Sequence, residues 1–378
     1  MRTEICEMLD IEFPILAFSH CRDVVAAVSK AGGMGVLGVT AHTPAQLEID
    51  CAWIEEQIGP HNSYGIDVLI PAKYLGSEEG GYDRNKLAGL VPEEHKQFLD
   101  ALLARYDVPP LPAGEVAPTG EGSWSHKGAQ PLIDISLSRP IKLIVNALGP
   151  APVELVAAAH ERGVKVAGLI GKRSHAQRQV NNGVDIIVAQ GTEAGGHTGE
   201  IATMVLIPEI VDAVAPVPVL AAGGIARGRQ VAAAMALGAK GVWCGSVWLT
   251  TEEAETHPVV KQKFLAATTS DTVRSRASTG KPARQLRTAW TDEWEDAANP
   301  KPLGMTLHGM LIAEAQRRIA RSATGHNPGA ERLINYFVGQ VVGQMNAIKP
   351  ARQVVLDMVE EYIDVVLAMS ANLAASGG

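Results

Sequence analysis

The sequence has few cysteines, few aromatic residues, no long apolar run and no excess of basic charge. Its four cysteines, Cys6, Cys21, Cys51 and Cys244, form no CxxC pair and show no metal-ligand spacing, so we expect reduced thiols and no metal site. No stretch approaches the roughly 20 apolar residues of a membrane-spanning helix. With 33 basic against 41 acidic residues, the net charge of −8 argues against nucleic acid or anionic lipid as a partner.

The overall composition favours a soluble protein of the α/β class. Residues 1–10 include two glutamates and no continuous apolar core, which does not fit a secretory signal, so we expect a cytoplasmic protein. Hydrophobic residues make up 46% and charged residues 20% of the chain, as in ordinary globular proteins. Because aromatic residues are only 4% and glycines number 38, close-packed helices on a parallel sheet are favoured over a β-sandwich.

Short apolar, often β-branched segments alternate with helical segments along most of the chain. Eight such pairs predict an α/β fold of the (β/α)8 TIM-barrel type. A doubly wound open sheet is the alternative, and it is disfavoured because no GxGxxG follows the first strand. The predicted strands are residues 11–18, 34–39, 64–70, 141–145, 164–170, 184–189, 217–222 and 240–244.

Two regions depart from this rhythm. Residues 71–138 are rich in proline and glycine, and we predict an insertion after the third strand with one helix at 92–105. A lid over the site and a tolerated surface excursion both fit this insertion. We assign residues 1–280 to the barrel, including that insertion, and residues 281–378 to an extended excursion and helices packed on the barrel. The predicted C-terminal helices are residues 309–322, 330–345 and 350–371, after an extended stretch at 270–302.

A glycine-rich loop with one histidine follows the sixth predicted strand. Residues 190–199 contain four glycines around His197. Glycine lets a backbone approach a ligand closely, and histidine titrates near neutral pH, as a general base should. A flexible turn with a surface histidine is the alternative. Glu193, in the same loop, is expected to be structural.

The two strands that follow also end in glycine. Gly223 and Gly224 follow the seventh strand, and Gly245 and Ser246 follow the eighth. In (β/α)8 barrels these turns precede helix N-termini and bind phosphate, so the sequence predicts a phosphate-bearing ligand here. Gln190 would then face the ligand's heteroaromatic part.

These motifs together resemble those of the nitronate monooxygenase family. The resemblance rests on residues 189–199 (AQGTEAGGHTG), 221–225 (AAGGI), 241–246 (GVWCGS) and 31–38 (AGGMGVLG), and it covers about residues 5–70, 140–280 and the last helices. It implies an FMN-dependent (β/α)8 enzyme that oxidises alkyl nitronates, with O2 as oxidant of the flavin and His197 as the catalytic base. The residues it implies near the cofactor are Ala17, Phe18, Ser19, Asp67, Lys172, Gln190, Gly191, Gly195, Gly196, Gly223, Gly224, Gly245 and Ser246.

Some positions differ from the family's usual pattern. Phe18-Ser19-His20 stands where relatives have Pro-Met, and Asp67 stands where they often have asparagine, so an ionised Asp67 would accept hydrogen bonds but not donate them. Lys172 stands where relatives have Thr or Ser, and it fits either charge on the flavin or an acidic substrate. The substrate therefore stays open.

Two other functions fit the same residues. The first is an FMN-dependent reductase or dehydrogenase that uses NAD(P)H with a quinone, an enoyl-thioester or a steroid-degradation CoA substrate. Arg274, Arg276, Arg284 and Arg287 are candidate contacts for the phosphates of such substrates. The second is a non-catalytic barrel that binds a phosphate-bearing ligand. In each case the partner is a small molecule, and a homo-oligomer is compatible with the sequence.

Overall fold

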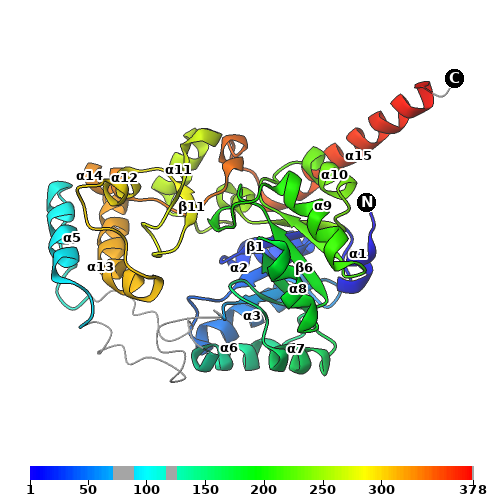
Figure 1. Ribbon diagram of the computed structural model, residues 1–378, viewed down its shortest axis with the longest axis horizontal. Helices are drawn as coiled ribbons and strands as arrows, with labels where there is room; N and C mark the ends of the chain where they lie inside the picture. Colours follow the sequence, from blue (N-terminus) through cyan, green and yellow to red (C-terminus); the bar gives the residue numbers. More distant parts are fainter. Residues whose placement is uncertain (71–88, 116–125, 377–378) are drawn as a thin grey trace.

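Eight parallel strands close into a barrel in the computed structural model, which describes residues 1–70, 89–115 and 126–376 (Figure 1). The closed order is β1-β2-β3-β4-β5-β6-β8-β9, so the predicted (β/α)8 TIM barrel is confirmed. Every predicted strand is present, with ends shifted by a few residues. The barrel strands are β1 (Ile15–Ser19), β2 (Met34–Gly38), β3 (Tyr64–Val68), β4 (Leu143–Asn146), β5 (Lys165–Ile170), β6 (Ile186–Gln190), β8 (Val219–Ala222) and β9 (Gly241–Cys244).

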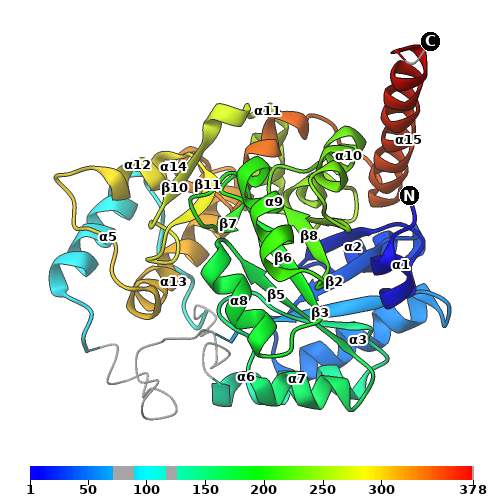
Figure 2. The same ribbon diagram turned by 45° about the vertical axis from the view of Figure 1, so that its right-hand side comes forward.

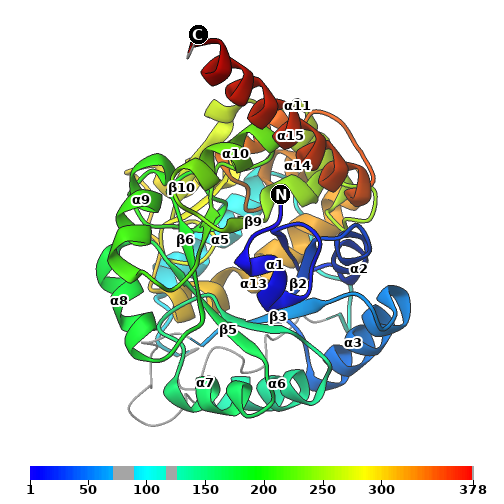
Figure 3. The same ribbon diagram turned by 90° about the vertical axis from the view of Figure 1, so that its right-hand side faces the viewer.

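Helices surround the barrel, as the view in Figure 3 shows. Their sequences carry the expected stop and start signals. Thr43, for example, accepts a hydrogen bond from the Gln46 N–H at 3.2 Å and caps α3, with Pro44 at its first position. The surrounding helices are α2 (Arg22–Lys30), α3 (Pro44–Ile58), α6 (His126–Ser138), α7 (Val153–His160), α8 (Arg173–Asn181), α9 (Thr203–Val214) and α10 (Gly228–Ala236).

Strand alternation divides the apolar side chains into two layers. One set points outward and packs under the helices, and the other fills the lumen with Leu16, Val36, Val145, Val188 and similar residues. The helix α1 (Glu4–Leu9) closes the amino end of the lumen with two buried side chains. The barrel is therefore a filled core, and a ligand has room only at its carboxyl end.

The region before β4 contains more helix than the sequence predicted. The predicted helix at 92–105 is confirmed as α5 (Glu93–Arg105), but the interpretation of the rest as loop is wrong for α6. Helix α6 contains Pro131 and packs against α3, α7 and β3, so it is the barrel's own crossover helix between β3 and β4. The remainder of the predicted insertion, residues 71–88 and 116–125, lies outside the described residues.

A second apolar cluster lies beside the carboxyl end of the barrel. It joins the insertion helix α5 to α11 (Pro258–Ala266), α12 (Ala289–Glu295), α13 (Met305–Thr324) and α14 (Pro328–Leu333). Trp290 and Trp294 are buried at its centre. Figure 1 shows these helices on the opposite side of the molecule from the barrel's α1 and α15. Segments that are far apart in sequence thus share one core.

The stretch predicted as extended, residues 270–302, forms an ordered hairpin and a helix. Strands β10 (Thr272–Ser275) and β11 (Ala283–Leu286) pair antiparallel, and β11 also pairs with the short β7 (Gly196–His197). Figure 2 shows this small sheet between the barrel and the second cluster. It links the histidine loop to the C-terminal half of the chain.

The predicted helix at 330–345 is also wrong. Helix α14 ends at Leu333, and the chain runs extended before the short 3-10 helix η4 (Gln340–Gln344). The extended part is held because Asn335 donates a hydrogen bond to the Gln285 side chain at 2.8 Å and Tyr336 accepts one from the Leu286 N–H at 3.1 Å. Tertiary pairing therefore replaces local helix propensity here.

The last helix, α15 (Ala351–Ser376), packs its first half on α10 and α2 and then projects from the body (Figure 1). Across the described residues, none of the helices combines the length and the apolarity that crossing a membrane requires.

Candidate active site at the carboxyl end of the barrel

The lumen ends in a set of side chains from several strands. By strand alternation Phe18, Asp67, Gln190 and Trp243 point inward at the carboxyl ends of β1, β3, β6 and β9. The rings of Phe18 and Trp243 stack with centroids 6.0 Å apart and planes 24° apart. This apolar floor lies where (β/α)8 enzymes bind their ligands. Ala17, by contrast, points outward into the core under the helices, so only its backbone faces this end.

The histidine loop is held by contacts from the hairpin β10–β11. His197 pairs with Ala283 in the small sheet, and Gly196 pairs with Arg284. The Arg284 guanidinium is buried and donates to the Thr192 carbonyl at 2.9 Å, while Arg274 donates to the Thr198 carbonyl at 3.4 Å. These two arginines, candidates for phosphate contacts in the sequence, instead fix both ends of the loop. The loop is a positioned element and not a flexible turn.

His197 itself is partly buried and hydrogen-bonded. Its Nε2 lies 2.9 Å from the Thr279 hydroxyl, and its ring faces Phe337 with centroids 6.4 Å apart. Burial, with a smaller contribution from the positive charge of Lys281, lowers the pKa of His197 to about 4. The imidazole is therefore neutral at pH 7, which is the form that accepts a proton.

Thr279 also influences which ring nitrogen of His197 is free to accept a proton. Its hydroxyl lies 3.1 Å from the Lys281 carbonyl, an acceptor to which it can donate. When the hydroxyl donates there, Nε2 of His197 donates to Thr279, and Nδ1 carries the free lone pair. The contact thus orients the ring and selects a tautomer.

Replacement of Thr279 by valine is expected to lower kcat/KM about tenfold, the equivalent of one lost hydrogen bond. The β-branched shape is kept, so the fold should not change. Thr279→Ser keeps the hydroxyl and should retain activity close to wild type. Steady-state kinetics of both variants check this, and equal activity of Thr279→Val and wild type would show that the contact has no functional role.

Lys281 makes the smaller contribution, after burial, to the lowered pKa of His197. Because a nearby positive charge disfavours the imidazolium, Lys281→Met should raise that pKa modestly above about 4. The acid limb of the kcat/KM profile should then move to higher pH, whereas Lys281→Arg should leave it in place. A pH profile that is the same for wild type and Lys281→Met would contradict the assignment of that limb to His197.

The glycine turns after β8 and β9 have the conformations that the phosphate prediction requires. Gly223 and Gly224 have φ angles of +93° and +72°, which favour glycine. Within the described part of the chain, the N–H groups of Gly224, Gly245 and Ser246 donate no hydrogen bond outside helices and strands. The Ser246 hydroxyl accepts from the Gly339 N–H at 2.8 Å, which leaves its own proton available. These donors lie in the turns that follow the neighbouring strands β8 and β9, where a barrel of this type binds an anion.

Other glycines of the loop serve the protein's own packing. A Cβ at Gly195 would lie 2.9 Å from the Gly339 nitrogen, and one at Gly191 would collide with Thr203. Gly196, with φ of +77°, has nothing within 4 Å of that position and faces open space. Gly191 and Gly195 are thus explained by protein contacts, whereas Gly196 and Gly245 border space for a ligand.

Two charged residues of this region have clear positions. The Glu193 carboxylate accepts from the Thr203 N–H at 3.0 Å and from its hydroxyl at 2.8 Å, so it caps α9 and its structural role is confirmed. Lys172 is exposed at the start of α8, beyond the carboxyl end of β5. Its predicted contact with a cofactor or substrate stays a prediction.

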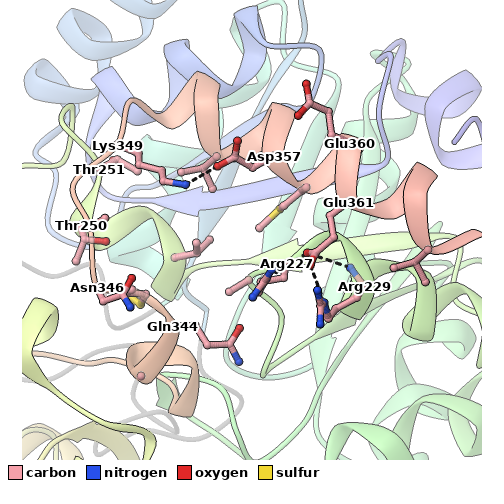
Figure 4. A pocket seen from close by; sticks show the side chains of 18 of the residues that line it. Arg227, Arg229, Thr250, Thr251, Gln344, Asn346, Lys349, Asp357, Glu360 and Glu361 are labelled. Carbon is pink, nitrogen blue, oxygen red and sulfur yellow. Dashed lines mark hydrogen bonds and ion pairs between the residues drawn. The ribbon is translucent and has the colours of Figure 1, made fainter.

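A large open groove lies elsewhere, between α10, η2 (Ser246–Thr250) and α15 (Figure 4). Its volume is about 910 Å³, but none of the predicted site residues lines it. Arg227 and Arg229 both pair with Glu361 at 2.6 Å, and Lys349 pairs with Asp357 at 2.7 Å. The positive side chains of this groove are thus paired with acidic side chains of the same groove. The polar groups at the barrel mouth are therefore the better candidate for the active site.

Several residues of the site were missed by sequence reasoning. Thr279, Lys281 and Phe337 come from the two segments whose structure was predicted wrongly, and no spacing ties them to His197. Trp243 is part of the GVWCGS motif at residues 241–246. Because side chains alternate along a strand, counting back from Gly245 predicts that the Trp243 side chain points into the lumen.

The fold and the site together define the class of protein: a (β/α)8 enzyme whose histidine and phosphate-type turns lie at the carboxyl end of the barrel. The family model for nitronate monooxygenase matches residues 2–361. The chain belongs to this family, and it is an oxidoreductase.

Individual relatives extend over nearly the whole chain. A Mycobacterium tuberculosis protein named "Putative monooxygenase Rv1533" is 60% identical over 367 residues, which cover 97% of this chain and 98% of the relative. A Staphylococcus aureus "Probable nitronate monooxygenase" is 26% identical over 370 residues, 92% of this chain and 98% of the relative.

Solved structures show the same architecture. FabK from Thermotoga maritima has a TM-score of 0.71 and 27% identity, covering 98% of this chain and 99% of that chain. Nitroalkane oxidase from Streptomyces ansochromogenes has a TM-score of 0.79 and 23% identity, covering 97% and 99%, and its likeness bears on the fold alone.

Proposed function

We propose that this protein is an FMN-dependent monooxygenase that oxidises alkyl nitronates, with His197 as the catalytic base. The single observation that carries the proposal is the fixed position of the His197 imidazole at the barrel mouth. Thr279 lies within hydrogen-bond distance of the ring, and Arg284 and Arg274 each donate a hydrogen bond to a carbonyl of the loop. A fixed, neutral imidazole with a free lone pair is in the protonation state that can accept a proton at pH 7.

The residues at the barrel mouth fit FMN. Gly223, Gly224, Gly245 and Ser246 offer N–H and hydroxyl donors for the phosphate, at the place where barrels of this type bind one. Asp67 leaves a buried carboxyl oxygen without a partner in the lumen, which suits a polar ring at that level. Gln190 makes no hydrogen bond through its side chain within the described residues, so its amide is available to the same ring.

The flavin and the residues of the chain would have different roles in the reaction. The bound flavin supplies the redox step. His197 takes the proton next to the nitro group of a neutral nitroalkane, which yields the nitronate, or it balances the charge that develops there. The hairpin contacts keep its ring in one orientation. The ammonium group of Lys281, whose charge acts on His197, favours an anion such as a nitronate beside the base.

The alternative is an FMN-dependent reductase or dehydrogenase that takes electrons from NAD(P)H and passes them to a quinone, an enoyl-thioester or another CoA substrate. Phe18 and His20, which replace the family's usual Pro-Met, occupy the lumen beside Gly38 and so change the floor of the substrate site. The cofactor and the base are the same in both functions, and the electron donor differs.

Oxygen consumption under steady-state turnover tests the proposal. Protein purified with FMN and supplied with an alkyl nitronate should consume O2, and NADH should not support comparable turnover with or without a quinone. Turnover that requires NADH and an electron acceptor, with none from nitronates, would favour the reductase. Absence of flavin from protein purified in the presence of FMN would contradict both.

A further inference from the structure

Asp67 is a carboxylate-type side chain in the middle of an apolar barrel. It lies on β3, where its backbone neighbours are Gly38 of β2 and Val145 of β4. Alternation along β3 sends Tyr64, Ile66 and Val68 outward and Asp67 into the lumen. The residue is only 3% exposed.

No group in the described part of the chain compensates this carboxyl. Its Oδ2 is buried without a hydrogen-bond partner, and among the described residues neither oxygen takes part in a hydrogen bond or ion pair. Phe18, Gln190 and Trp243, which also point into the lumen near its carboxyl end, are apolar or uncharged. The ring of His20 lies against Gly38, the β2 neighbour of Asp67, and its Nδ1 lies 2.7 Å from the Gly38 carbonyl oxygen.

A second buried aspartate of this chain, Asp50, has hydrogen-bond partners for both of its carboxyl oxygens. Asp50, 7% exposed, receives hydrogen bonds from Arg22 at 2.8 Å, from Gln46 at 2.9 Å and from His42 at 3.0 Å. Asp67 has none of these partners. Since an unpaired charge is unfavourable in a buried apolar environment, the ionised form of Asp67 is disfavoured.

We infer that Asp67 is a neutral carboxylic acid whose O–H group donates a hydrogen bond to the ring of FMN in the barrel lumen. The inference rests on the proposed cofactor. Burial alone raises the pKa of Asp67 well above its ordinary value, which agrees with the geometry. A neutral carboxyl can donate a hydrogen bond, as can the asparagine amide that relatives often have at this position. The expectation that Asp67 could only accept hydrogen bonds holds for the ionised form, which this environment disfavours.

A coupling between protonation and cofactor binding follows. If FMN binds the neutral form, its affinity should fall as pH rises through the pKa of Asp67 in the cofactor-free protein, by up to tenfold for each further pH unit. The pKa of His20 is lowered, so this side chain is neutral at the alkaline end and adds no charge there. Asp67→Asn, which donates at every pH, should lack this fall.

Two measurements test the inference on full-length protein. The first is the FMN dissociation constant, from quenching of flavin fluorescence, for wild type, Asp67→Asn and Asp67→Leu. At pH 7 we expect Asp67→Asn to bind within about threefold of wild type and Asp67→Leu to bind at least tenfold more weakly, since one donor is lost. Tighter binding by Asp67→Asn of tenfold or more would indicate an ionised Asp67 and overturn the inference, as would wild-type affinity in Asp67→Leu.

The second measurement is made first on the wild-type protein, and the variants only assign its band. The infrared difference spectrum between FMN-bound and FMN-free wild type should contain the C=O stretching band of a protonated carboxylic acid, shifted in D2O and absent from Asp67→Asn. Asp50→Asn should keep the band. A carboxylate band in its place would overturn the inference while leaving the cofactor assignment intact, whereas a wild-type protein that binds no FMN would contradict the proposed function itself.

Discussion

His197→Ala is expected to retain FMN and to lose about 10²- to 10⁴-fold in kcat/KM for a neutral nitroalkane, the usual contribution of a positioned acid–base group. The imidazole contacts Thr279 and Phe337 at the surface of the loop, while the phosphate-type turns lie in separate segments, so its removal should leave cofactor binding unchanged. Steady-state kinetics and the flavin absorbance of the purified variant measure the two effects independently.

An exposed histidine provides the control for that variant. His326 is remote from the barrel mouth and faces Glu331 at the start of α14. His326→Ala should keep full activity. If His197→Ala is as active as this control, His197 is not the base, and the chemistry must rest on another residue of the lumen.

Gly245→Leu is expected to abolish stable FMN binding, with a dissociation constant raised at least 100-fold. The φ angle of Gly245 is −117°, which any residue adopts, and the nearest atom to an added Cβ is in Phe18, 3.7 Å away. The new side chain should therefore be tolerated by the fold and fill the space beside the phosphate-type turn. Flavin content after purification and a fluorescence titration with FMN measure the loss.

Gly304→Leu is the matched control. Gly304 is an exposed glycine with φ of −62° before α13, and nothing lies within 4 Å of an added Cβ. It should bind FMN like wild type. Wild-type affinity in Gly245→Leu, with a melting temperature close to that of the control, would mean that the cofactor does not occupy the turn after β9.

The barrel could be predicted from the sequence because the patterns that specify its strands, helices and turns are local. Apolar strands of four to six residues, helix caps such as Thr43-Pro44 and glycine stops recur along the chain, and each acts within a few residues. The glycine turns were readable for the same reason, since a positive φ at Gly223 and Gly224 is a property of the residue type.

The surroundings of His197 were not readable because they depend on long-range pairing. Thr279 and Phe337 meet the histidine only after β11 has paired with β7 and the extended chain after α14 has paired with β11. Helix α6 was missed for another reason: Pro131 and the glycines before it suppress the helical signal, and packing against α3 and α7 overrides this. Likewise, the protonation state of Asp67 depends on its neighbours in the lumen and not on the sequence of its own strand.

Anaerobic mixing of the FMN-bound protein with an alkyl nitronate, and separately with NADH, tests the central claim most directly. The claim is that nitronates reduce the flavin and that His197 assists. We predict rapid loss of the oxidised flavin absorbance with the nitronate and slow or no loss with NADH. When the neutral nitroalkane replaces the nitronate, the loss should be at least 100-fold slower in His197→Ala than in wild type. Rapid bleaching by NADH alone, with no reaction of the nitronate, would contradict the account.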